Sequence, residues 1–177
     1  MKVGPADGSL TLRTGVAGSA ARMGHSLVIV VDDWSADIAL TRGAARSVRL
    51  TAELASLRVE SGSGGIKPLS EGDREAIRAN ALRTLHAEQH PQVSFESTSI
   101  RARGTGLTVE GTLTVSGSPQ PLAAVVDLDR SGDDVHARCT VVVVQSEFGV
   151  TPYSAMLGQL RVADEVRVSL DLTVAAR

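Results

Sequence analysis

The sequence predicts a mainly β protein: an antiparallel β-barrel of about eight strands with one α-helix inserted around residues 70–87. Short runs of valine, threonine, leucine and isoleucine alternate with charged residues, as in strands that are buried on one face only. Glycines separate these runs, and one segment carries helix formers instead. A barrel of this size encloses either packed side chains or one small ligand, and a two-sheet sandwich is the alternative architecture.

Nine runs are expected to form strands. The last of them shows the pattern most clearly, because Val166, Val168 and Leu170 share one face while Arg167 and Ser169 lie on the other. The apolar face of this strand is expected to point into the barrel. The expected strands cover residues 9–14, 25–31, 34–40, 47–60, 92–101, 106–117, 120–129, 134–145 and 165–174.

The helix is expected over residues 70–87, where Ile77, Ala81 and Leu85 fall at helical spacing. Ser70 is a suitable cap for its first turn, and Pro91 follows its end. The glycine-rich stretch before Ser70 is expected to be the loop that leads from a strand into this helix.

Bulk composition limits the class of protein. A chain of 177 residues with 42% hydrophobic content is expected to form one domain over residues 1–177. Its net charge of −2 gives no broad attraction for nucleic acid. The single cysteine, Cys139, has no partner for a disulfide within the chain, so a cytoplasmic location is expected. Neither a secretory signal nor an integral membrane segment is expected, because no apolar stretch is long enough.

The stretch "QSEFGVTPYSA" (145–155) follows the most apolar run and holds two of the four aromatic rings. Gly149 and Pro152 predict a turn away from the barrel wall. We expect the strand to end at a rim of the barrel, with Phe148 pointing inward and the hydroxyl of Tyr153 near water. These rings either seal that end or gate it.

Six segments occur together in an order and spacing that resemble the YceI-like family of lipocalin-like proteins, over nearly the whole chain. They are "GHSLVI" (24–29), "SVRLTAELASLRV" (47–59), the helix running into "HPQVSFEST" (90–98), "VEGTLTVSGSPQPL" (109–122), "SEFGVTPYSA" (146–155) and "LRVADEVRVSLDL" (160–172). The start of the chain resembles a cytosolic branch of the family without a signal peptide.

The resemblance implies a lipocalin-like barrel that binds polyisoprenoid or other long-chain lipids. The sequence departs from the family in two ways. The family often has a basic residue shortly before the S-[DE]-F-G turn, where this chain has Val144 and Gln145. The typical barrel of the family is also lined with aromatic side chains, whereas aromatic residues make up 2% of this sequence. The resemblance therefore specifies the fold more closely than the ligand.

If a long aliphatic chain is bound, the resemblance and the strand pattern together suggest the residues that contact it. The aromatic rings of Trp34 and Phe95 are on different strands and are expected to lie in the same barrel. Trp34 is also a candidate for ordinary core packing, with its indole covering one end of the barrel. His25 and Arg13 are candidates for contact with a polar head group. The candidate ligand-binding residues are Leu27, Ile29, Trp34, Phe95, Leu113, Val115, Val142, Val144, Phe148 and Tyr153. Side chains of this kind also fill solid cores, and both alternatives stay open here.

Motifs for chemistry are weak in this sequence. His86 and His90 have a spacing that suits two metal ligands on a helix, but Pro91 follows directly, so no metal site is expected. Cys139 lies inside an expected strand without an activating base nearby and is expected to pack in the core. No acid, base and nucleophile converge in one motif, so we expect neither an enzyme nor a cofactor.

Two functions remain. The first is non-enzymatic binding of an elongated apolar ligand inside the barrel, such as a polyisoprenoid, an isoprenoid quinone or a fatty-acid-like lipid, by a carrier or storage protein. The second is a solid barrel that acts as a dimeric scaffold or stress-associated interaction protein, which predicts no interior pocket above about 300 Å³. A homodimer is also suggested by the valines at 141–144, which make both faces of one strand apolar and require a cover from the helix or a second subunit.

Overall fold

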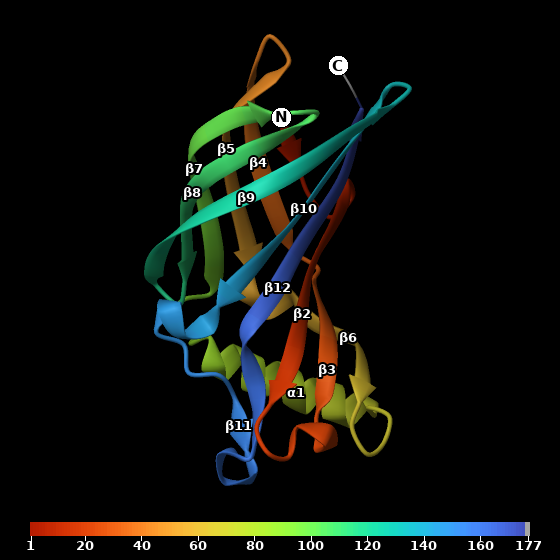
Figure 1. Ribbon diagram of the computed structural model, residues 1–177, viewed down its shortest axis with the longest axis vertical. Coiled ribbons are helices and arrows are strands. Elements are labelled where there is room, and N and C mark those ends of the chain that lie inside the picture. The colour runs from red at the N-terminus through yellow and green to blue at the C-terminus, as the bar shows by residue number, and fades with distance from the viewer. Residues whose placement is uncertain (176–177) are drawn as a thin grey trace.

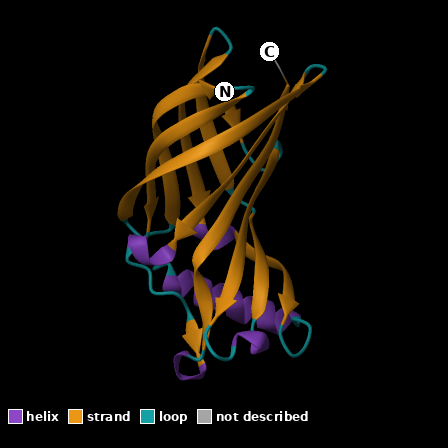
Figure 2. Cartoon of the chain, in the orientation of Figure 1, coloured by secondary structure: helices purple, strands orange, loops and turns teal. Residues whose placement is uncertain are grey.

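One curled antiparallel sheet forms most of the molecule, which confirms the mainly β, lipocalin-like fold (Figure 1; Figure 2). The computed structural model describes residues 1–175, and residues 176–177 of the expected domain lie outside the described part. The strands pair in the order β1-β4-β5-β7-β8-β9-β10-β12-β2-β3-β6, and β11 pairs with β12. They are β1 (Lys2–Val3), β2 (Gly8–Ala17), β3 (His25–Val31), β4 (Trp34–Thr41), β5 (Ala44–Glu53), β6 (Leu57–Gly64), β7 (Gln92–Arg103), β8 (Gly106–Val115), β9 (Ser118–Ser131), β10 (Asp134–Val144), β11 (Ser154–Ala155) and β12 (Leu160–Ala175).

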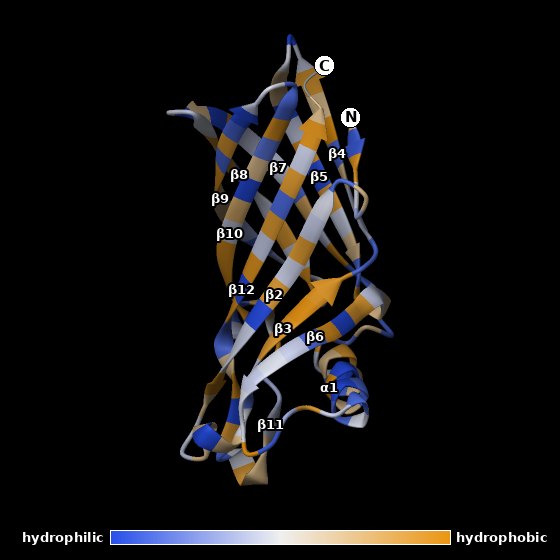
Figure 3. Ribbon diagram, turned by 90° about the vertical axis from the view of Figure 1, so that its right-hand side faces the viewer, coloured by the Kyte–Doolittle hydropathy of each residue, from blue (hydrophilic) through white to orange (hydrophobic). Residues whose placement is uncertain are grey.

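The alternation of apolar and polar residues sets which face of each strand lines the interior. Figure 3 shows this alternation as coloured bands along β10 and β12. In β12, Val166 and Leu172 are buried, whereas Arg167 and Asp171, which lie between them in the sequence, are exposed. The expected inward face of this strand is therefore confirmed.

The run 47–60, expected as one strand, is divided into β5 and β6. A single 3₁₀ turn, η2 (Leu54–Ser56), separates them. The division is needed because β5 pairs with β4 and β7, whereas β6 pairs with β3 at the far end of the sheet order. Ser56 holds the bend: its Oγ donates to the carbonyl of Glu53 at 2.8 Å and accepts the backbone N–H of Asp33 at 2.9 Å.

The predicted helix is present as α1 (Glu71–Thr84), slightly shorter than the expected range 70–87. Ser70 caps it as predicted, because its Oγ accepts the backbone N–H of Asp73 at 3.1 Å while the Asp73 carboxylate accepts the N–H of Ser70 at 2.9 Å. The backbone N–H and the hydroxyl of Ser70 both donate to the Asp73 carboxylate, and these bonds, with the nearby Lys67, hold the pKa of Asp73 below its ordinary value. His86 adopts positive φ just beyond the helix, so His86 and His90 do not share a helical face.

Helix α1 lies across one end of the curled sheet (Figure 1). Two arginines attach it to β6 and to the turn before that strand. Arg74 Nη1 donates to the carbonyl of Glu60 at 2.7 Å, and Arg78 Nε donates to the carbonyl of Leu57 at 2.7 Å. A second guanidinium nitrogen of Arg78 donates to the carbonyl of Ala55. In the described residues, no helix has the length and apolarity needed to cross a membrane.

Candidate functional site

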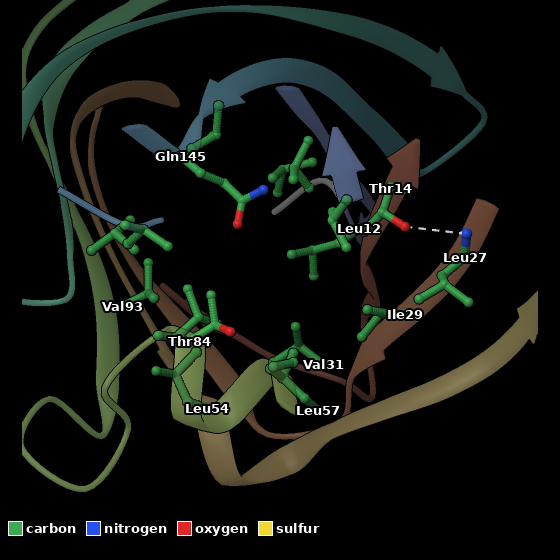
Figure 4. A pocket seen from close by; sticks show the side chains of 18 of the residues that line it. Leu12, Thr14, Leu27, Ile29, Val31, Leu54, Leu57, Thr84, Val93 and Gln145 are labelled. Carbon is green, nitrogen blue, oxygen red and sulfur yellow. Dashed lines mark hydrogen bonds between the residues drawn. The ribbon is translucent and has the colours of Figure 1, made fainter. Parts of the chain in front are cut away.

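An apolar cavity of about 460 Å³ lies between the concave face of the sheet and α1 (Figure 4). Its wall is built from most strands of the barrel, from α1 and from the stretch that follows β10. The volume exceeds the lower end of ordinary ligand pockets, about 300 Å³. The interior is therefore hollow, and the prediction of a solid barrel is wrong.

Most of the residues predicted to meet a ligand lie in the wall of this cavity. They come from strands that are distant in the sequence and adjacent in the sheet, which is why the alternation pattern could find them. Figure 4 labels Leu27 and Ile29 in this wall. The predicted residues that line the cavity are His25, Leu27, Ile29, Phe95, Leu113, Val115, Phe148 and Tyr153.

The prediction for the end of β10 was wrong by one residue. Val141 and Val143 line the cavity, whereas Val142 and Val144 lie on the other face, and Val142 is 44% exposed. The sequence contained the signal for this, because Arg138 and Thr140 share their face with Val142 and Val144, and polar side chains face solvent. Since Val142 is exposed, α1 does not cover this strand, and the homodimer stays a prediction.

Two other candidates lie elsewhere. Trp34 is 3% exposed and belongs to the main core cluster with Val3, Ala36 and Leu172, so it packs the core and does not line the cavity. Arg13 is exposed on the outer face of β2, because its neighbours Leu12 and Thr14 are the residues that turn inward. Arg13 is therefore not a head-group ligand inside the cavity.

A few polar groups of the cavity wall were missed by the sequence analysis. Thr14 accepts the backbone N–H of Leu27 at 3.2 Å, and the Gln145 amide donates from Nε2 to the carbonyl of Ala163 at 3.0 Å. Figure 4 shows the Gln145 side chain pointing into the pocket from the end of β10. From α1, Asn80 and Thr84 join the wall, where the helical periodicity had identified only apolar neighbours. In a wall that is mostly apolar, a few polar side chains of this kind set the orientation of a ligand.

His25 lines the cavity at the end near the loop between β6 and α1. Its Nε2 lies 2.8 Å from the carbonyl of Lys67. Gly65 allows this approach, because a Cβ at that position would lie 2.3 Å from the imidazole ring. The imidazole is thus held by the loop, with one nitrogen already engaged.

The stretch 145–155 ends β10 at the rim of the cavity, as predicted. Phe148 is buried, and Val150 next to it is the most buried large side chain of this cluster. Gly149 adopts a left-handed conformation with φ 73°, which lets the chain turn away from the wall. Tyr153 lines the cavity but is 42% exposed, so it stands where the cavity reaches the surface.

Cys139 is the one titratable cavity residue whose pKa is clearly shifted, among the residues described. Burial raises the pKa of its thiol and outweighs a hydrogen bond with the Leu170 backbone, which acts in the opposite direction. The other shifted groups, Asp32, Arg49, Arg58 and Asp73, lie outside the cavity in exposed ion pairs or the helix cap. In residues 1–175, no three histidine, cysteine or acidic side chains are placed to hold a metal ion.

The raised pKa of Cys139 predicts slow alkylation. At pH 8 the folded protein is expected to react with N-ethylmaleimide more slowly than free cysteine, because less of the thiol is ionised and the sulfur is buried. Adding palmitate is expected to slow the reaction several-fold further, since the acyl chain would cover the same wall. Mass spectrometry follows the single adduct, and unfolding in urea should restore the fast rate. An unchanged rate with palmitate would show that the ligand does not reach Cys139.

The fold and the cavity define a class: a lipocalin-like antiparallel barrel with an apolar interior. The model of the YceI-like domain matches residues 7–174, and the chain belongs to the YceI-like family. No curated protein matched the chain.

Solved structures with the same fold include proteins from two bacteria. The crystal structure of BcnA from Burkholderia cenocepacia is 20% identical, with a TM-score of 0.72, and the match covers 97% of this chain and 98% of that one. The YCEI protein of Campylobacter jejuni is 13% identical, with a TM-score of 0.62 and 84% of each chain covered. At these identities, the likeness establishes the fold.

Proposed function

We propose that this protein binds one elongated apolar molecule in its cavity, as a non-enzymatic carrier or storage protein. Polyisoprenoids, isoprenoid quinones and fatty-acid-like lipids have the chemistry that the cavity fits. The observation that carries the proposal is a hollow interior of about 460 Å³ whose wall is mostly apolar. Membership of the YceI-like family, whose barrel is associated with polyisoprenoid binding, supports it.

Burial of the ligand's chain would supply the affinity. Each 100 Å² of apolar surface removed from water contributes about 2.5 kcal/mol, less the cost of ordering the chain. The volume lies in the lower part of the usual range of ligand pockets, about 300–1,000 Å³, which favours a single chain. A longer isoprenoid would leave part of its length outside, beyond Tyr153. The unpaired Cys139 suits a carrier in a reducing compartment such as the cytoplasm.

The polar groups of the wall suit binding better than catalysis. Gln145 and Thr14 are already paired with backbone groups, and burial disfavours the reactive thiolate of Cys139. No nucleophile and base lie within hydrogen-bond distance of each other in the cavity wall, among the described residues. This arrangement suits the orientation of a ligand better than proton transfer between neighbouring side chains.

The proposal is tested by native mass spectrometry of freshly purified protein, followed by organic extraction and lipid analysis. We expect a mass increment that corresponds to one bound isoprenoid or acyl compound per chain. Protein that carries none is then titrated with cis-parinaric acid, a fluorescent fatty acid. If no lipid co-purifies and the probe does not bind at a one-to-one ratio, the carrier function is wrong.

A further inference from the structure

The exposed residues of the cavity wall lie at one end of the barrel, among the residues described. Of all the residues in its wall, Met23, Tyr153 and Arg161 are the exposed ones. Met23 and Tyr153 lie in the segments that join β2 to β3 and β10 to β12, and Arg161 lies at the start of β12. These segments meet at the end of the barrel where α1 crosses the sheet (Figure 1). We call the three segments at this end the mouth loops: residues 18–24, 65–69 and 151–159.

The mouth loops expose large apolar side chains to solvent. Leu157 is fully exposed, and Ile66 is 76% exposed, which makes these the two most exposed large hydrophobic residues described. Met23, Tyr153 and Met156 are also exposed here. Together they place five apolar or aromatic side chains around the mouth of an apolar cavity, where a protein that functions in water alone would carry polar ones.

The backbone of one mouth loop presents two of these side chains. Met156 and Leu157 both adopt left-handed conformations, with φ values of 53° and 56°. This region is disfavoured for residues with a Cβ, and more so at two successive positions. The result is a tight turn that directs Leu157 away from the barrel. A strained turn that exposes a leucine to solvent indicates that this leucine contacts an apolar environment outside the protein.

The charged residues in and next to the mouth loops indicate which apolar environment this is. The mouth loops contain Arg22 and Lys67 and no aspartate or glutamate, and Arg161 follows directly in β12. The chain as a whole carries a net charge of −2, so the mouth loops differ from it in sign, while Glu71, Asp73 and Glu75 lie beside them in α1. Lys67 lies 3.6 Å from Asp73, whereas Arg22 and Arg161 have no ion-pair partner among the described residues.

We propose that the mouth loops dock on the surface of an anionic phospholipid bilayer. Leu157, Met156 and Ile66 enter the boundary between head groups and acyl chains, while Arg22 and Arg161 meet lipid phosphates. A second copy of this chain fits the surface less well, because two copies would bring the same basic residues together. The inference rests on the proposed function and deepens it, since it names the bilayer as the source from which an apolar molecule enters the cavity.

The test is co-sedimentation of the full chain with vesicles. Wild type is expected to sediment with vesicles of phosphatidylglycerol and phosphatidylcholine, less with phosphatidylcholine alone, and less at high salt. Leu157→Glu is expected to weaken binding to the anionic vesicles by about tenfold or more. The matched control is Leu40→Glu, an exposed leucine in the β4–β5 hairpin at the opposite end of the barrel (Figure 1). It is expected to bind vesicles as wild type does.

Docking is overturned if wild type stays in solution with anionic vesicles, or if the two variants lose binding equally. It is also overturned if Leu157→Glu changes only the oligomeric mass, because the loop would then contact a second copy. Binding of cis-parinaric acid, measured on the same samples without vesicles, distinguishes the docking proposal from the carrier proposal. A variant that retains the probe and no longer binds vesicles supports docking, whereas wild type that retains the probe and ignores vesicles leaves only the carrier function standing.

Discussion

Val143→Trp is expected to abolish one-to-one binding of cis-parinaric acid, weakening it by about tenfold or more. Val143 points into the cavity, so an indole at this position would occupy the space in which an apolar chain lies. The cavity gives the larger side chain room, which limits the cost of overpacking to about 1–3 kcal/mol. Fluorescence titration of the folded variant measures the loss.

The matched control for this substitution is the next residue. Val142→Trp places the same ring on the outer face of β10, where the valine is already exposed. We expect this variant to bind the probe as wild type does. Equal loss in both variants would mean that β10 is disturbed as a whole, and retention in both would show that the probe binds outside the cavity.

Trp34→Ala is expected to lower the free energy of unfolding by about 3–5 kcal/mol. Trp34 is the largest side chain in the main core cluster and is almost completely buried, so its removal leaves a cavity that the neighbouring strands cannot close. A fall of roughly 10 °C in Tm should accompany the loss. Circular dichroism is the suitable readout, because the variant removes the only tryptophan of the chain.

Tyr153→Ala serves as the control for Trp34→Ala, since it removes another aromatic ring from a half-exposed position. Its cost is expected to stay within about 0.5 kcal/mol. Because Trp34 does not line the cavity, Trp34→Ala that is folded at low temperature should still bind cis-parinaric acid. A small loss of stability at Trp34, or a loss of binding without unfolding, would contradict the assignment of Trp34 to the core.

Much of the fold could be predicted from local patterns. Period-two alternation located the inner faces of β3 and β12, and Ser70, a residue suited to cap a first turn, located the start of α1. The run 47–60 was different. Its apolar positions are even-numbered up to Leu54 and odd-numbered from Leu57, so the alternation changes phase at the 3₁₀ turn, a signal that the sequence analysis missed. That change of partners depends on which strands are adjacent in space.

The cavity could be predicted only in part. The inward residues of single strands follow from alternation, and the error at Val142 and Val144 arose in a run of valines where both faces look alike. Whether an interior is filled or hollow depends on the summed volumes of many side chains from distant segments. The polar residues Gln145, Asn80 and Thr84 enter the wall because β10 ends and α1 crosses at that level, which no short motif records.

The attachment of α1 has a consequence for how this barrel could aggregate. Strand β6 ends the pairing order of the sheet, and Arg74 and Arg78 occupy carbonyl groups along it and in the turn before it. An edge with free backbone groups is a template on which another chain can add a strand. A swing of α1 wide enough to widen the cavity would break these hydrogen bonds and free those carbonyls. The two arginines that hold α1 in place therefore also protect this edge against intermolecular strand pairing.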